Sequence, residues 1–315
     1  MAKEFFAHTE TRQLFQTVED VCRRSSVSRG QAFEDLLRAS VAALAAETME
    51  EDYLDAIKAH TAGAKGKRGV DLFPEFFAQL VEAMNGNDAD ILGDLFQGAI
   101  SYGENGLYLT PPAVSRLMAA LTVGPEVSDP DGAAPLIHDP CCGTGILLMD
   151  AGQASPRAEL VGQDIDPRCA RITSINLGLR GKYGWVICGN TLSREVQFVY
   201  RIANFFHEGP NGRRRGVIRQ VPAEACPLLP EIMRGTRQDV RERLESTTEP
   251  AAPAESMPPR IIEVPQWLWW LEQRMTKAQE AMLPPKRGED SPPAAETDQE
   301  SRTEEGSTTQ GRLFD

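Results

Sequence analysis

The chain has 315 residues, of which 41% are hydrophobic and 25% are charged, so it can bury one substantial core. No run of eighteen apolar residues occurs, and the first residues lack the basic and apolar regions of a secretory signal, so we expect a cytoplasmic protein with no membrane segment. The net charge of -13 argues against binding of duplex DNA by charge alone, although much of the acidic excess lies in residues 288–315.

Residues 1–105 are expected to form a helical N-terminal domain. Apolar residues recur there at helical spacing in two stretches, Phe33, Leu36, Leu37 and Val41, then Phe76, Phe77, Leu80, Val81 and Met84. Between the stretches, residues 59–71 are rich in glycine and basic residues, which predicts an exposed loop. Its Lys65, Lys67 and Arg68 are interpreted as solvated, with a phosphate contact as the alternative.

From residue 106 to 244, short apolar runs alternate with helical stretches. This alternation is typical of repeated strand–helix units and a parallel sheet. It predicts helices at 111–122, 144–153 and 167–180, with strands at 135–138, 159–163 and 185–188. Two later runs, 197–206 and 215–221, are further strand candidates.

The rest of the chain is divided by composition into three parts. Residues 245–260 are rich in proline, alanine and glutamate and are expected to be a linker, and residues 261–284 an amphipathic helix. One face of that helix carries Trp267, Trp270, Leu271 and Arg274. This face is interpreted as part of the core, with a partner-binding surface as the alternative. Residues 285–315 are expected to be a disordered acidic tail.

A glycine-rich turn follows the first predicted strand of the sheet. The segment DPCCGTG places Asp139, Pro140, Gly143, Thr144 and Gly145 between that strand and the next helix. Glycine lets such a turn tighten and lets a ligand lie against the main chain. Asp139, at the strand end, is placed to meet the ammonium of a bound amino-acid moiety.

Asp164 follows the next apolar strand, about twenty residues downstream, in the segment GQDIDP. An acidic side chain there accepts hydrogen bonds from both hydroxyls of a ribose. The turn and Asp164 together predict a nucleoside site. The six cysteines show no CxxC pair and no Cys/His ligand spacing, so we expect no metal.

DPCCGTG followed by GQDIDP resembles the first two motifs of the N-6 adenine-specific DNA methyltransferases, including the methylation subunits of type I restriction systems. GLYLTPP resembles the segment that closes over the methionine end of the cofactor in that family, at Tyr108 and Thr110. CGNTL places Asn190 where the family has a polar residue near the cofactor's adenine. The resemblance covers about residues 30–192 and implies S-adenosyl-L-methionine as cofactor, held by Tyr108, Thr110, Asp139, Pro140, Gly143, Thr144, Gly145, Asp164, Ile165 and Asn190.

The resemblance implies an α/β fold with a Rossmann-like S-adenosylmethionine-dependent methyltransferase sheet, complete or abbreviated, after the helical domain. It also implies DNA as partner and transfer of a methyl group to the exocyclic amino group of a flipped adenine. The family's catalytic motif, [N/D]PP[Y/F], has no counterpart in the sequence. The nearest match is NFFH, with Asn204 and His207 as catalytic candidates, but its phenylalanines cannot rigidify a loop as two prolines do.

Two alternatives follow from the missing motif. One is a catalytically inactive cofactor-binding subunit or an adaptor that has DNA and the sliding clamp as partners, with a separate specificity or catalytic subunit as a further candidate partner. The other is a methyltransferase acting on protein or RNA, which the order of the motifs disfavours.

A predicted turn is followed by four arginines, Arg213, Arg214, Arg215 and Arg219. They are interpreted either as a phosphate contact or as part of a solvated loop.

The last residues, QGRLFD, resemble the QxxLF peptides with which bacterial DNA-processing proteins bind the replication sliding clamp. In such peptides a flexible tether presents two apolar side chains, here Leu313 and Phe314, to a pocket. Gln310 would fix the register by hydrogen bonds. The sliding clamp is therefore a candidate partner.

Overall fold

The computed structural model describes residues 4–45, 48–101, 108–123, 134–193, 195–209, 212–226 and 229. All of them lie in one contact unit, Met1–Ala281. The predicted linker at 245–260, the helix at 261–284 and the tail at 285–315 lie outside the described residues. The clamp-binding candidates Gln310, Leu313 and Phe314 do so as well, and the domain boundaries stay predictions.

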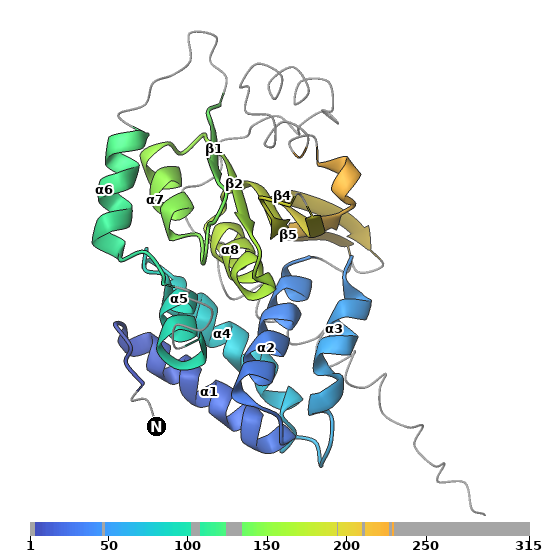
Figure 1. Cartoon of the computed structure of the whole chain (residues 1–315). Helices are drawn as coiled ribbons and strands as arrows, with labels where there is room; N and C mark the ends of the chain where they lie inside the picture. The colour runs from blue at the N-terminus through green and yellow to red at the C-terminus, as the bar shows by residue number, and fades with distance from the viewer. Residues whose placement is uncertain are drawn as a thin grey trace, which may run out of the picture. The chain divides into compact units, whose positions relative to one another are not determined.

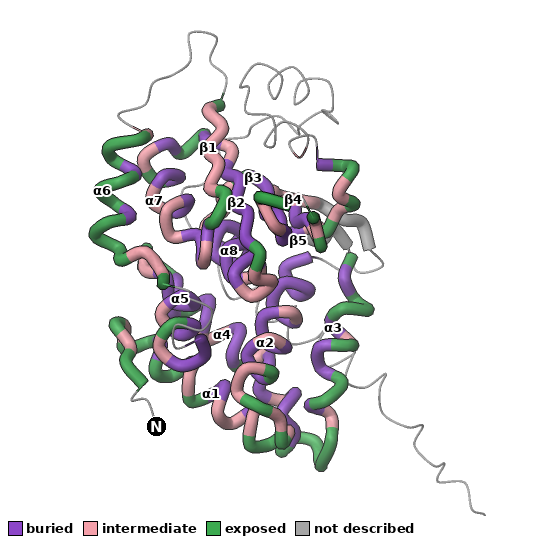
Figure 2. The backbone as a smooth tube through the Cα atoms, viewed as in Figure 1, coloured by how far each residue is buried: buried purple, intermediate pink, exposed green. Residues whose placement is uncertain are grey.

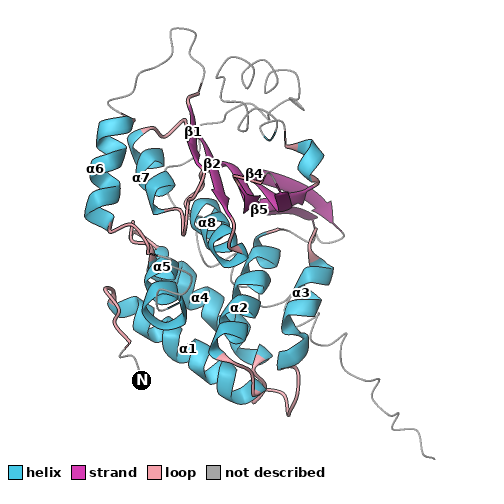
Figure 3. Ribbon diagram, in the orientation of Figure 1, coloured by secondary structure: helices cyan, strands magenta, loops and turns pink. Residues whose placement is uncertain are grey.

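The first hundred residues are helical, as expected (Figures 1 and 3). Their helices are α1 (Thr9–Ser25), α2 (Arg29–Leu44), α3 (Glu50–Ile57), η1 (Lys58–His60), η2 (Val70–Leu72), α4 (Phe73–Met84), α5 (Ile91–Leu95) and the π-helical turn η3 (Phe96–Ser101). Phe33 of α2 stacks on Phe96 of η3, with ring centroids 5.8 Å apart. Both rings are fully buried, which anchors α2 against the end of α5.

The α/β part contains a mixed sheet whose strands follow one another in chain order. The strands are β1 (Leu136–Asp139), β2 (Glu159–Asp164), β3 (Tyr183–Asn190), β4 (Glu195–Gly209) and β5 (Gly212–Val221), and the helices are α6 (Pro112–Thr122), α7 (Ile146–Ala154), α8 (Pro167–Leu179) and η5 (Ala223–Ala225). β1, β2 and β3 are parallel, whereas β4 and β5 extend the sheet beyond β3 as an antiparallel hairpin.

Helices α7 and α8 cover the same face of the parallel strands. A Cβ on Gly162 of β2 would lie 3.0 Å from Leu148 of α7 and 3.2 Å from Thr173 of α8, so this glycine lets both helices approach the strand. On its other side α8 contacts α2, so the N-terminal helices and the sheet share one hydrophobic core (Figure 1).

Every predicted element of residues 111–221 is present, with ends that shift by two residues or fewer for the helices and the parallel strands. The predicted parallel sheet holds for β1 to β3. The expected exposure of Arg68 is wrong. Its side chain is buried because the guanidinium donates to Asp71 at 2.7 Å, which ties the loop to η2.

Within the described part of the chain, each helix falls short of the length or the hydropathy that crossing a membrane requires. The same residues contain no group of histidine, cysteine and acidic side chains arranged to hold a metal ion.

Gly184 sits where β3 pairs with β2, and we expect Gly184→Ala to disrupt that pairing. A Cβ there would lie 1.7 Å from the carbonyl oxygen of Leu160, a backbone atom that cannot move without shifting β2. The substitution should lower the free energy of unfolding by about 3 kcal/mol or prevent folding.

Gly30→Ala is the matched control, because a Cβ at Gly30 of α2 would meet no atom within 4 Å. It should leave the stability unchanged or raise it slightly, since alanine favours helix. Urea denaturation of both variants measures the difference, and equal stability of the two would contradict the strand pairing described here.

Candidate functional site

The turn after β1 depends on two glycines with left-handed backbone conformations. Gly143 has φ 54° and Gly145, which precedes the first residue of α7, has φ 85°. A Cβ on Gly145 would also lie 2.9 Å from the side chain of Thr173 in α8. Both observations explain why the turn requires glycine, as the sequence predicted.

Hydrogen bonds hold this turn against the end of β2 and against α8. The backbone amide of Cys142 donates to the carbonyl oxygen of Gln163 at 2.9 Å, which continues the β1–β2 pairing into the turn. The Thr173 hydroxyl donates to the carbonyl oxygen of Gly143 at 2.9 Å. The amide of Gly143 donates to Asp164 Oδ2 at 2.8 Å, so the turn is fixed to the end of β2.

Asp164 is an almost buried carboxylate that binds backbone amides on both sides. Besides Gly143, its Oδ1 accepts from the amide of Asp166 at 2.8 Å. Burial raises the pKa of Asp164, the two amide donors oppose that rise, and the neighbouring Asp166 and Asp139 add to it. Each carboxylate oxygen can accept more than one hydrogen bond, so further donors can still bind here.

Asp139 ends β1 beside the same turn. Its Oδ1 accepts from the amide of Cys141 at 3.1 Å, but its Oδ2 is buried without a hydrogen-bond partner. Burial raises the pKa of Asp139. A buried carboxylate oxygen without a donor is costly, which marks this position as one that a cationic or hydrogen-bonding ligand would stabilise.

A cleft of about 870 Å³ lies at the carboxyl ends of the three parallel strands. This volume falls within the range of small-molecule sites, roughly 300 to 1,000 Å³. Eight of the ten predicted cofactor residues line it, namely Tyr108, Thr110, Pro140, Gly143, Thr144, Asp164, Ile165 and Asn190. Asp139 and Gly145 are next to lining residues in the chain but are not part of the wall.

The far wall of the cleft is the loop after β3. Asn190 Oδ1 accepts from the amides of Leu192 and Ser193, at 2.9 and 3.2 Å, and so fixes the loop conformation. The Thr191 hydroxyl donates to the carbonyl oxygen of Pro140 at 2.8 Å, which joins this loop to the turn after β1. The predicted positions of Asn190 and the glycine turn therefore meet in one site.

Tyr108 and Thr110 precede α6 and also line the cleft. Pro111 is the N-cap of α6 and Pro112 its first residue, as predicted for a turn that enters a helix. Tyr108 is 82% exposed, so its ring is available to a ligand or a partner. The outer face of α6 is exposed as well (Figure 2).

The two predicted catalytic residues are not brought to this cleft. Asn204 donates to the hydroxyl of Tyr183, the first residue of β3, at 3.1 Å, whereas the cleft lies at the last residue, Asn190. At about 3.3 Å per residue the two ends of β3 are roughly 23 Å apart. His207 is further along β4, in register with Arg214, and its side chain lies outside the described part.

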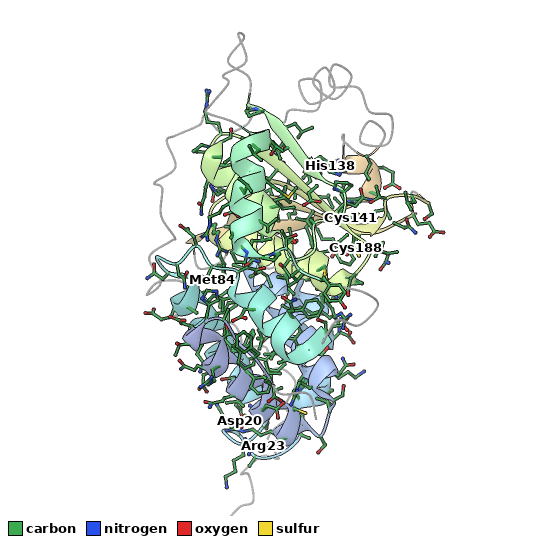
Figure 4. All side chains as sticks on the ribbon, turned by 60° about the vertical axis from the view of Figure 1, so that its left-hand side comes forward. Asp20, Arg23, Met84, His138, Cys141 and Cys188 are labelled. Carbon is green, nitrogen blue, oxygen red and sulfur yellow. The ribbon has the colours of Figure 1, made fainter. Side chains whose placement is uncertain are left out.

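The structure adds cleft residues that the sequence motifs did not indicate. Glu34 comes from α2, and Asp166 and Arg168 from the start of α8. Arg168 pairs with Asp166 at 2.7 Å and stacks over Phe96, which connects the cleft to the N-terminal helices. A smaller hollow of about 210 Å³ at Asp20, Arg23 and Arg24 is a surface feature of α1, far from the sheet (Figure 4).

The comparisons with known proteins agree with this geometry. Residues 87–203 match the model of the N-6 DNA methylase family. This part of the chain is similar to that family. A relative, the type II methyltransferase M.MamI of Microbacterium ammoniaphilum, is 35% identical over 112 residues, which are 30% of this chain and 31% of the relative. The match thus spans about a third of that methyltransferase's length.

Two solved structures share weaker similarity with the chain. One is assigned as a class I S-adenosylmethionine-dependent methyltransferase of Listeria monocytogenes, with a TM-score of 0.35, 17% identity, and 56% of this chain and 52% of that chain covered. The other is a type I restriction-modification methyltransferase subunit of Streptococcus thermophilus, with a TM-score of 0.27, 14% identity, and 53% and 55% covered. In this chain β1 to β3 with α7 and α8 form a Rossmann-like α/β unit.

The cleft should make Cys141 the most reactive of the six cysteines. Cys141 is exposed, whereas Cys142, Cys169, Cys188 and Cys226 are buried and Cys22 is partly buried. Burial raises the pKa of Cys142, Cys169 and Cys22, and that of Cys188 to about 12, which disfavours their reactive thiolates. Iodoacetamide followed by peptide mass spectrometry should modify Cys141 first.

Cys141→Ser should remove the fast phase of this alkylation, and Cys142→Ser should leave it intact. Modification of Cys142 at the rate of Cys141 would show that the turn is open and not packed against β2.

Proposed function

We propose that the cleft binds S-adenosyl-L-methionine and that this N-6 DNA methylase-like protein takes part in methylation of the exocyclic amino group of adenine in DNA. The observation that carries the proposal is the convergence of the glycine turn, Asp164 and Asn190 on one cleft at the carboxyl ends of parallel strands. Ligands of open α/β sheets bind at this end of the strands.

The residues present fit this cofactor. The carboxylate of Asp164 is placed to accept hydrogen bonds from the ribose hydroxyls, with the exposed side chain of Ile165 beside it as an apolar wall. Asn190 lies where it would contact the adenine. The unpartnered Oδ2 of Asp139 would meet the ammonium of the methionine moiety, and Tyr108 and Thr110 would cover that end.

When bound, the cofactor would supply an electrophilic methyl group on a sulfonium sulfur, for transfer to an amino nitrogen with the neutral thioether as leaving group and loss of a proton from that nitrogen. The described part of the chain would hold and orient that donor through the side chains of Asp164 and Asp139 and through the glycine turn of residues 143–145. Such positioning is a large part of catalysis of group transfer. Presentation of the adenine is a separate task, which the [N/D]PP[Y/F] motif performs in the family.

A second candidate function, a cofactor-binding subunit that needs another polypeptide for catalysis, is supported by the state of β1. Within the described residues β1 pairs only with β2, so its other edge has no strand neighbour. On the neighbouring strand β2 the side chain of Gln163 is fully buried, and within the described residues neither of its polar atoms has a hydrogen-bond partner; the same is true of Nε2 of His138 in β1. An added strand–loop unit carrying the missing motif would fit this edge. Under this proposal the partners are DNA, a catalytic or specificity subunit and, through the C-terminal peptide, the sliding clamp.

Calorimetric titration with S-adenosylmethionine tests the proposal, and we expect binding that weakens in acid. The pKa of Asp164 is raised in the free protein, and donors from a ribose favour its ionised form, so binding lowers that pKa. Affinity is therefore highest above the raised pKa and falls as the pH drops through it. A series of titrations at falling pH should show a Kd that is constant at neutral pH and rises once the pH drops through the raised pKa of Asp164.

Adenosine is the matched ligand for this titration, because it keeps the ribose but lacks the ammonium that Asp139 would meet. Its pH dependence therefore reports on Asp164, and the additional dependence of S-adenosylmethionine reports on Asp139. If well-folded protein gives no heat of binding with S-adenosylmethionine and none with adenosine, the proposed function is wrong. Equal affinity at all pH values would contradict the role of Asp164 alone.

Incubation with methyl-labelled cofactor and DNA of mixed sequence separates the two candidate functions. We expect no label in the DNA from this chain alone, because the described cleft brings no polar–Pro–Pro–aromatic loop to the cofactor. Asp164→Asn serves as the background control. Label on adenine that is absent with Asp164→Asn would show that the chain itself is the complete enzyme.

A further inference from the structure

Asp90, outside the cleft, joins the N-terminal helices to the glycine turn. It is the N-cap of α5, where its Oδ1 accepts from the amide of Gly93 at 2.9 Å. The same oxygen accepts from Asn176 Nδ2 of α8 at 2.9 Å. Its Oδ2 accepts from the hydroxyl of Thr144, in the middle of the turn. One carboxylate thus binds three elements that are far apart in the sequence.

Thr144 is held by both its side chain and its main chain. While its hydroxyl donates to Asp90, its carbonyl oxygen accepts from Asn176 Nδ2 at 2.9 Å. Thr144 is 1% exposed and Asn176 is fully buried, so water does not compete for these bonds. Thr144 lies between the two glycines with left-handed conformations, so it is the residue through which side chains can fix the turn.

The carboxylate of Asp90 is stabilised in its buried position. Burial raises its pKa, while the three hydrogen-bond donors and the charge of Arg180 oppose the rise. Arg180 itself donates to the carbonyl oxygen of Ala89 at 2.7 Å and so stays beside Asp90. A residue that only caps a short helix needs no hydrogen bonds from Thr144 and Asn176 and no neighbouring arginine. The presence of these groups therefore indicates that Asp90 has a role beyond capping α5.

We propose that Asp90 is a positioning residue for the cofactor: it holds Thr144 so that the glycine turn of residues 143–145 keeps the conformation that shapes the wall of the cleft. This inference rests on the proposed function of the cleft. It makes the N-terminal helices part of the cofactor site, although Asp90 would not touch the ligand. Because coupling between two sites is reciprocal, cofactor binding should in turn stabilise the start of α5.

Two substitutions test the role. Asp90→Ser keeps a side chain that can cap α5 but is too short to reach Thr144 or Asn176, and Thr144→Val removes only the hydroxyl. Each should raise the Kd for S-adenosylmethionine about tenfold, as expected for loss of a hydrogen bond to a charged group. The double variant should lose little more than either single variant, because both break the same contact.

Asp94→Ala is the matched control from the same helix. The carboxylate of Asp94 accepts from the amides of Ala7 and His8, at 2.9 and 3.0 Å, and from the Thr11 hydroxyl at 2.7 Å, all remote from the cleft. Asp94→Ala should lower the thermal midpoint of unfolding but leave the Kd for S-adenosylmethionine unchanged when binding is measured well below that midpoint. Hydrogen exchange at the Gly93 amide should slow on cofactor binding in the parent protein and not in Asp90→Ser.

The outcomes separate this inference from the proposed function. If the parent protein does not bind S-adenosylmethionine, the function of the cleft is wrong. If it binds, and Asp90→Ser and Thr144→Val bind equally well while folded, the cleft stands and the positioning role is wrong. Additive losses in the double variant would also overturn it, because they would mean that Asp90 and Thr144 act separately.

Discussion

The site depends on the carboxylate of Asp164, whose two oxygens accept from the amides of Gly143 and Asp166. These bonds join the loop after β1 to the loop after β2, so the cleft has a fixed wall before any ligand arrives. They also keep an acidic group almost buried, and its raised pKa shows the cost of that burial. Donors from a ligand would lower this cost, which links the affinity for a ribose to the architecture of the sheet.

The N-terminal helices take part in the site and are not only an attached domain. Phe33 and Phe96 stack within the shared core, and Arg168 lies over Phe96 with its guanidinium 5.0 Å from the ring centroid. Arg171 of α8 pairs with Glu34 of α2 at 3.2 Å, and Glu34 also lines the cleft. The family match begins at residue 87, so it includes α5 and Asp90. The unit that forms the cleft therefore starts well before β1.

The sequence predicted the elements and eight of the cleft's residues because their signals are local. A glycine in the sequence indicates a turn that needs a left-handed backbone conformation. An acidic residue directly after an apolar run, such as Asp139 or Asp164, indicates a strand whose end lies at a binding site. The contact between Asp90 and Thr144 spans 54 residues and leaves no local pattern. Likewise, Arg68 looks like a loop cation until Asp71 is seen to bury it. The hairpin of β4 and β5 brings Asn204 to the wrong end of β3, a consequence of strand direction that spacing alone cannot give.

The order of the strands supports the proposed division between cofactor binding and catalysis. All three parallel strands end at the cleft, and the hairpin extends the sheet on the side of β3, away from β1. The face that α7 and α8 leave free carries a small apolar cluster around Val161 and Ile187, and within the described residues Cys226 and Leu229 join it from beyond β5. Parallel strands are ordinarily covered on both faces, and buried polar groups such as Gln163 are ordinarily paired. Within the described residues, the edge of β1 is therefore the place where a further strand would complete the sheet.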